Sequence, residues 1–166
     1  MTLAESGRAL VGFLLLVVAH FTLRPLLGGP VLVDFLTIAV LFSAVRVRPG
    51  AAAAIGVAVG VSLDSLSPGS FGTAALAYTC VAFLASRLNA AFFTDNISLT
   101  GAFVLAGKWA VDAVTLLLSG GLADTQSLMQ LLVWSPLSAV LTAVVALFLL
   151  AVARPWFAVT VAPNRR

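Results

Sequence analysis

The chain has 166 residues, of which 61% are hydrophobic and only 9% charged, and its mean hydropathy is +1.14. A soluble domain carries about 25% charged residues, so no soluble fold of this size could bury so much apolar surface. The composition therefore predicts a polytopic membrane protein. The pI near 10.0 does not indicate nucleic-acid binding, because the nine basic residues are few and scattered. A single cysteine, Cys80, excludes a disulfide framework and a paired-cysteine metal site.

Six apolar segments are candidates for membrane spans, each of which needs about 20 residues, with a range of about 17–25. We place these spans at about residues 8–27, 31–46, 49–66, 70–92, 97–119 and 128–153. The loops between them are short, which leaves no room for a module outside the membrane. The sequence therefore predicts one integral membrane domain over residues 1–166, an all-α bundle of six helices.

The basic residues give this bundle an orientation, because Lys and Arg are enriched in cytoplasmic loops. One side would hold seven of the nine: Arg8, Arg46, Arg48, Arg87, Arg154, Arg165 and Arg166. Only Arg24 lies on the other side, and Lys108 falls inside the fifth span. We therefore expect a multi-pass membrane protein with both termini in the cytoplasm.

The third span carries a ridge of small residues that ends in an acid. Ala52, Gly56 and Gly60 recur every four positions, and the next step is Asp64. Small residues at this spacing let helix backbones approach closely in lipid. A Ser67-Pro68-Gly69 break follows, and Gly72 begins the next helix. The ridge serves internal packing or partner docking, and we expect internal packing.

Two charges lie inside the fifth span and are expensive there. Lys108 and Asp112 are four residues apart, so they share one face of the helix and can neutralise each other. We expect an intramembrane ion pair that fixes helix register, with Asp64 as a partner of Lys108 from another helix. A proton or substrate relay would need more acids or a histidine in the bundle. His20, alone near the end of the first span, is not a metal site, and we expect it to form hydrogen bonds at the membrane interface.

The sequence contains no catalytic motif. It has no HExxH, no Walker loop and no GxSxG. An intramembrane aspartic peptidase would need two carboxylates that share a proton, for which Asp64 and Asp112 are the available pair. Lys108 beside Asp112 would keep that acid ionised. We therefore expect no enzyme, no catalytic residues, no cofactor and no metal site.

The run from Val33 to Leu84 resembles the MreD family, the rod shape-determining membrane proteins of bacteria. That family has a pattern of Pro-Asp, an apolar run, basic residues, a Gly-rich helix, Asp-x-x-Ser and Gly. Here the pattern reads Val33-Asp34, an apolar run to Val45, Arg46-Val47-Arg48-Pro49, Gly56 and Gly60, Asp64-Ser65-Leu66-Ser67, and then Gly69 and Gly72. Val33 stands where the family has proline, which weakens the entry turn of the second helix but leaves Asp34.

The resemblance implies a non-enzymatic scaffold of the cell-elongation machinery, or elongasome, that supports the regulation of peptidoglycan synthesis. It implies a fold similar to the substrate-binding S-components of energy-coupling factor transporters, which are six-helix bundles. The implied partner is MreC, and through it RodA, a penicillin-binding transpeptidase and MreB, with membrane lipid around the bundle. It also makes Asp34, Gly56, Gly60, Asp64, Ser67, Gly69 and Gly72 positions of a family motif.

A vitamin-binding S-component is the alternative, because hydropathy does not separate two families that share a fold. Such a protein would line an outward pocket with polar and aromatic groups. The candidates for that lining are Arg24, Asp34, Asp64, Asp124, Gln126 and Gln130. The apolar segments contain no dense polar cluster, which favours the interaction protein.

Overall fold

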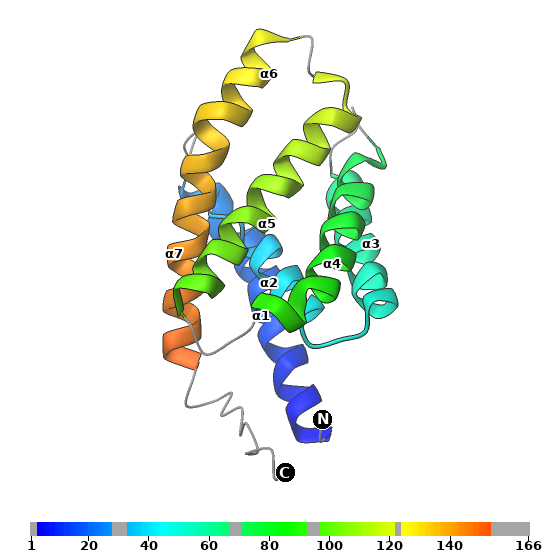
Figure 1. The fold of residues 1–166 in the computed structure, drawn as a ribbon, viewed down its shortest axis with the longest axis vertical. Helices are drawn as coiled ribbons and strands as arrows, with labels where there is room; N and C mark the ends of the chain where they lie inside the picture. Colours follow the sequence, from blue (N-terminus) through cyan, green and yellow to red (C-terminus); the bar gives the residue numbers. More distant parts are fainter. Residues whose placement is uncertain (1–2, 28–32, 67–70, 93–96, 122–123, 154–166) are drawn as a thin grey trace.

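The structure is a computed structural model that describes residues 3–27, 33–66, 71–92, 97–121 and 124–153. Over these residues it is all-helical (Figure 1). The helices are α1 (Leu3–Leu27), α2 (Phe35–Ala44), α3 (Pro49–Asp64), α4 (Thr73–Phe92), α5 (Ile97–Leu118), α6 (Thr125–Met129), a π-helical turn η2 (Gln130–Trp134) and α7 (Ser135–Ala153). Since α6, η2 and α7 follow one another without a break, the described residues form six helical rods.

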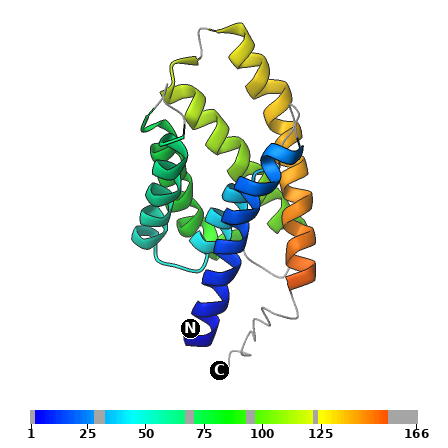
Figure 2. The same ribbon diagram turned by 180° about the vertical axis from the view of Figure 1, so that it is seen from behind.

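The short helix α2 lies at the centre of the bundle and contacts α1, α3, α4, α5 and α7. Eight of its ten residues are buried, and Leu36, Ile38 and Leu41 are among the largest side chains fully enclosed. A helix that is apolar all round must be covered on every side. The other helices surround it, and α1 crosses in front of it in the view of Figure 2. Its central place explains how ten residues organise the core.

Helices α3 and α4 form the most extensive helix pair, and glycines make their close approach possible. A Cβ on Gly60 would lie 2.3 Å from the Cα of Ala75, and one on Gly56 would lie 2.5 Å from the carbonyl oxygen of Tyr78. Both distances are far below van der Waals contact, so only glycine fits at either position. The ridge of small residues therefore packs internally against the backbone of α4.

The π-helical turn η2 ends at Trp134, two residues before Pro136. Proline has no N–H, and its ring collides with the carbonyl four residues earlier, so an uninterrupted α-helix is strained there. This helical turn contains one extra residue, so the N–H of Ser135 donates to the carbonyl of Gln130, five residues earlier. Such turns occur frequently at functional sites, and this one lines a polar cavity of the bundle.

The helices differ in length from the predicted spans, most of all at the second. Helix α2 covers Phe35–Ala44 where residues 31–46 were predicted, because Asp34 caps it at its start and the chain turns at Val45. Residues 31 and 32 lie outside the described part. By length and composition alone, two helices in the described residues could cross a membrane, Ser98–Leu118 and Thr125–Val152. By the same criteria the apolar stretches of the other described helices, such as Gly7–Leu23 in α1 and Thr73–Leu88 in α4, are shorter.

Candidate functional site

The polar centre of the bundle begins at Asp34, which caps α2. Its carboxylate accepts hydrogen bonds from the backbone N–H of Thr37 at 3.1 Å and from the Thr37 hydroxyl at 2.8 Å. An acid at this position satisfies helix donors that would otherwise be orphaned. The backbone N–H of Asp34 in turn donates to the hydroxyl of Thr142 on α7. Asp34 thus ties the start of α2 to the helix at the far end of the chain.

Lys108 lies between two carboxylates. Its ammonium group contacts Asp112 one turn along α5, and Asp34 Oδ2 at 3.5 Å. The Lys108 side chain is only 9% exposed, so its charge needs these partners. Asp112 also accepts a hydrogen bond from the hydroxyl of Ser135, the first residue of α7. The ion pair within α5 therefore extends to α2 and α7 and holds the three helices in register.

Two further side chains complete what we call the Asp34 cluster (Asp34, Lys108, Asp112, His20 and Tyr78). The Tyr78 hydroxyl, from α4, donates to Asp34 Oδ2 at 3.1 Å and lies 3.2 Å from the Thr37 hydroxyl. His20 Nδ1, from α1, is 3.6 Å from Asp34 Oδ1. His20 is 3% exposed, so it is buried inside the bundle beside a carboxylate, while its position at the membrane interface stays a prediction. Side chains from α1, α2, α4 and α5 meet here.

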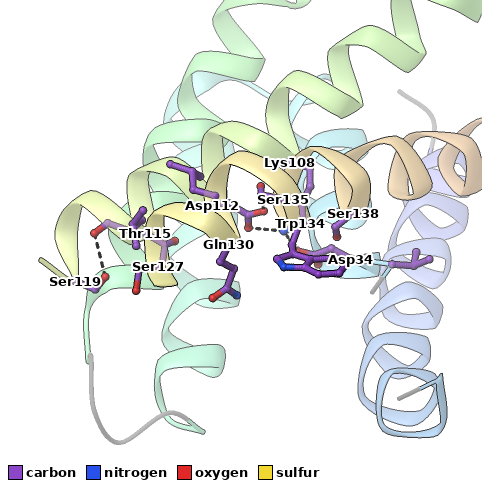
Figure 3. A pocket seen from close by; sticks show the side chains of 13 residues that line it. Asp34, Lys108, Asp112, Thr115, Ser119, Ser127, Gln130, Trp134, Ser135 and Ser138 are labelled. Carbon is purple, nitrogen blue, oxygen red and sulfur yellow. Dashed lines mark hydrogen bonds and ion pairs between the residues drawn. The ribbon is translucent and has the colours of Figure 1, made fainter. Parts of the chain in front are cut away.

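A cavity of about 560 Å³ opens beside this cluster, between α5 and the helix formed by α6, η2 and α7. Figure 3 shows its polar side chains in a row from Ser119 at one end to Asp34 at the other. The lining residues are Val33, Asp34, Lys108, Asp112, Thr115, Leu116, Ser119, Ser127, Gln130, Leu131, Trp134, Ser135 and Ser138. Its volume falls within the range of small-molecule sites, about 300–1,000 Å³. Two carboxylates, Asp34 and Asp112, and one ammonium group, Lys108, give the lining one net negative charge.

Asp64 lies in a different environment, the junction between α3 and α4. Its carboxylate accepts hydrogen bonds from the N–H groups of Gly72, Ala74 and Ala75 at 3.0, 3.1 and 2.9 Å. The last residue of α3 thus caps the start of α4, where backbone N–H groups lack partners within the helix. Gly72 has a φ of +98°, which glycine adopts without a Cβ penalty. We call this arrangement the Asp64 junction.

The expected contact between Asp64 and Lys108 is absent from the structure, although both residues are described. The carboxylate that reaches Lys108 from another helix is that of Asp34, while the N–H groups of α4 occupy Asp64. The Asp64–Asp112 pair considered for a peptidase is also not formed, since Asp112 binds Lys108 and Ser135. Asp34 and Asp112 therefore neutralise the buried Lys108 ammonium group, and Asp34 and Asp64 each cap the start of a helix.

The remaining predicted residues separate into several groups. Gly56 and Gly60 lie on the packed ridge, whereas Ser67 and Gly69 lie outside the described residues. Of the six polar candidates for a vitamin pocket, two line the cavity, Asp34 and Gln130. Two others, Asp64 and Asp124, cap helices. Gln126 is exposed, and the side chain of Arg24 is outside the described part. The Ser127 hydroxyl and the N–H groups of Gln126 and Ser127 lower the pKa of the Asp124 carboxyl.

Reasoning from the sequence missed His20 and Tyr78 as members of the cluster. Tyr78 is the only tyrosine of the chain, and it falls inside an apolar span. A tyrosine at such a depth needs a partner for its hydroxyl, which was the available signal. Nothing in the local sequence pairs it with Asp34, because the two lie 44 residues apart.

Over the described residues, the fold and the cluster define a class of protein, an all-helical membrane protein with a polar cluster at its centre and large apolar side chains on its outer faces. A family model described as "rod shape-determining protein MreD" matches residues 8–158, nearly the whole chain. The chain therefore belongs to the MreD family and is a rod shape-determining membrane protein. No curated protein and no solved structure matches it.

Proposed function

We propose that the chain crosses the bacterial inner membrane six times with both termini in the cytoplasm. The asymmetry of its basic residues supports this orientation. The start of α1 and the end of α7 also lie at the same end of the bundle (Figure 1). Helix α2, about 15 Å long from ten residues, is shorter than a bilayer core of about 30 Å. It would make its pass enclosed by the other helices and out of contact with lipid.

We propose that the protein is a non-enzymatic scaffold of the cell-elongation complex that binds MreC. Through MreC it would connect to RodA, a penicillin-binding transpeptidase and MreB, and support the regulation of peptidoglycan synthesis. The observation that carries this proposal is the family match over residues 8–158. The geometry is compatible with action by contact, because the charged groups of the Asp34 cluster bind one another. Large apolar side chains remain on the outer faces, among them Phe148 at 66% exposure.

Affinity purification from the native cell in mild detergent, followed by mass spectrometry, tests this proposal. Recovery of MreC in an amount comparable to the tagged protein would support it, and preparations without MreC would contradict it. Exposed apolar residues, one from each of five helices, can then be replaced by alanine to locate the docking face. Suitable positions are Leu14, Val57, Leu84, Leu105 and Phe148. Loss of MreC from one of these variants, with the other four as matched controls, would identify the helix that binds it.

A vitamin-binding S-component is the second candidate, and the polar cavity beside the Asp34 cluster favours it. Gln130 and Trp134 line that cavity, as an amide and an aromatic ring would in a small-molecule site. The same purified preparation distinguishes the two functions. A vitamin present in stoichiometric amount, without MreC, would replace the scaffold by a transporter component.

A further inference from the structure

A second hollow, which we call the α1 groove, lies toward the end of the bundle where α1 begins and α7 ends. It has a volume of about 500 Å³. Its lining residues are Ala9, Leu10, Gly12, Phe13, Leu15, Leu16, Ala39, Phe42, Ser43, Arg46, Val47, Ile55, Leu149 and Leu150. The groove exists because α1 makes its extensive packing contacts with α2. Space therefore remains between α1 and the neighbouring parts of α3 and α7.

The α1 groove is apolar along its length and basic at one end. Ser43 and Arg46, at the end of α2, are its polar lining residues, and none of the described lining residues is Asp or Glu. Arg8 is exposed on α1, one turn before the lining residue Gly12 and on the same side of the helix. A second guanidinium is thus placed near the Arg46 end. An occupant with an apolar tail and an anionic head matches this distribution.

The surroundings of the groove point to a lipid chain as its occupant. An apolar hollow left empty would lose the dispersion contacts of its walls, and lipid chains surround the bundle in a membrane. Basic pockets between membrane helices on the cytoplasmic side bind anionic lipid head groups.

We infer that the α1 groove binds an anionic phospholipid. The phosphate lies at Arg46, with Ser43 and Arg8 nearby, and an acyl chain lies along α1 between Leu10 and Leu16. This site is separate from the polar cavity at the opposite end of the bundle. It makes one defined lipid part of the packing between α1 and the rest of the protein.

Competition between two lipids that share acyl chains tests the inference. The purified protein is reconstituted in vesicles of equal palmitoyl-oleoyl phosphatidylglycerol and palmitoyl-oleoyl phosphatidylcholine. It is then extracted in mild detergent, and the retained lipids are counted by native mass spectrometry. We expect phosphatidylglycerol to be retained about fivefold over phosphatidylcholine, from the attraction of a basic residue for an anionic head group.

Two pairs of variants assign the retention to the groove. Arg46→Gln should remove most of the preference for phosphatidylglycerol, whereas Arg87→Gln, on α4 and outside the groove, should leave it unchanged. Leu10→Trp should fill the groove and reduce retention of both lipids. Leu14 is 52% exposed on the same helix but does not line the groove, so Leu14→Trp is its control. Because Leu10 is 59% exposed, its replacement leaves the core intact.

Three results would overturn the inference: equal retention of the two lipids by the wild type, equal effects of Arg46→Gln and Arg87→Gln, or equal effects of Leu10→Trp and Leu14→Trp. A photo-crosslinking residue at position 10 provides an independent measurement in cells. An adduct with lipid would support the site. An adduct with another protein would show that a partner occupies the groove instead.

Discussion

Asp34 and Asp64 both cap a helix inside an apolar bundle, but their surroundings differ. Backbone N–H groups at the start of α4 donate hydrogen bonds to the Asp64 carboxylate, and Asp64 is 3% exposed. Asp34 receives a backbone N–H, two hydroxyls and an ammonium group, and it lines a cavity. The Asp64 junction is thus closed on itself, whereas the Asp34 cluster depends on side chains from four helices. The first fixes a turn, and the second fixes the arrangement of the bundle beside a space that a ligand could enter.

The largest expected effect is that of Lys108→Leu in the Asp34 cluster. The substitution leaves Asp34 and Asp112 without their shared cation, and breaking a buried pair in this way costs about 3–5 kcal/mol of stability. Lys108→Leu combined with Asp112→Leu should be less damaging than Lys108→Leu alone, because one uncompensated charge is removed. Melting temperatures in detergent measure the effect. Strictly additive losses would reject the pairing.

Gly60→Leu should be the next most severe change and acts on the side of the Asp64 junction. Its Cβ would meet the backbone of Ala75 at 2.3 Å, so α3 and α4 must separate at a cost of about 3 kcal/mol. Gly50→Leu is the matched control, because a Cβ at Gly50 meets nothing within 4 Å. Size-exclusion profiles and melting temperatures report the difference. Normal behaviour of Gly60→Leu would show that α3 and α4 do not pack through this ridge.

Asp64→Ala removes the acceptor of three backbone N–H groups at once. We expect a loss of about 2–3 kcal/mol, the size of a lost set of charge-assisted hydrogen bonds in a buried site. Asp124→Ala removes an exposed cap of similar geometry, on α6, and should cost less. Thermal unfolding of the two variants side by side makes the comparison. Equal and mild effects would contradict the buried role of Asp64.

Tyr78→Phe should weaken the Asp34 cluster without touching the Asp64 junction. It removes one donor to Asp34 and keeps the ring in the core, so we expect a loss of about 1 kcal/mol. Tyr78→Phe should cause no further loss of stability in an Asp34→Ala background, where the carboxylate acceptor is already gone. A full loss in that background would show that the hydroxyl acts on another group.

The smallest effect concerns pH and the exposed cap at Asp124. Its folded pKa is lowered, mainly by the Ser127 hydroxyl, so its contribution is present above the unfolded pKa of about 3.9 and is lost as pH falls through the folded pKa. The drop in melting temperature between about pH 6 and about pH 3 should therefore be slightly smaller in Asp124→Asn than in the wild type. An identical drop in both proteins would show that the Asp124 carboxyl does not contribute to the loss of stability at low pH.

Local spacing allowed part of this arrangement to be predicted. The four-residue repeat of Ala52, Gly56 and Gly60 indicated a packing ridge, and the spacing of Lys108 and Asp112 placed both on one helix face. Pro136 could also have indicated a break in the sixth span. These signals lie within a single helix, where the period of 3.6 residues determines which side chains meet.

Contacts between helices could not be predicted, because they depend on how far each helix is rotated and shifted against its neighbours. Asp64 and Asp34 were both available acids on other helices, and nothing in the sequence decided which of them reaches Lys108. The contacts of His20 and Tyr78 with Asp34 could not be predicted for the same reason, because they arise from the central position of α2 between the other helices. That position follows from the apolar character of α2 on every side, and the continuous apolar sequence around the helix hid where it begins and ends.

A pair of double-mutant cycles on purified protein tests the contrast between the two acids most directly. One cycle combines Lys108→Leu with Asp34→Asn, and the other combines Lys108→Leu with Asp64→Asn, with stability read from thermal unfolding. The structure predicts a coupling of about 1–3 kcal/mol between Lys108 and Asp34, and additivity within about 0.5 kcal/mol for Lys108 and Asp64. Coupling of Lys108 to Asp64 and not to Asp34 would contradict the account.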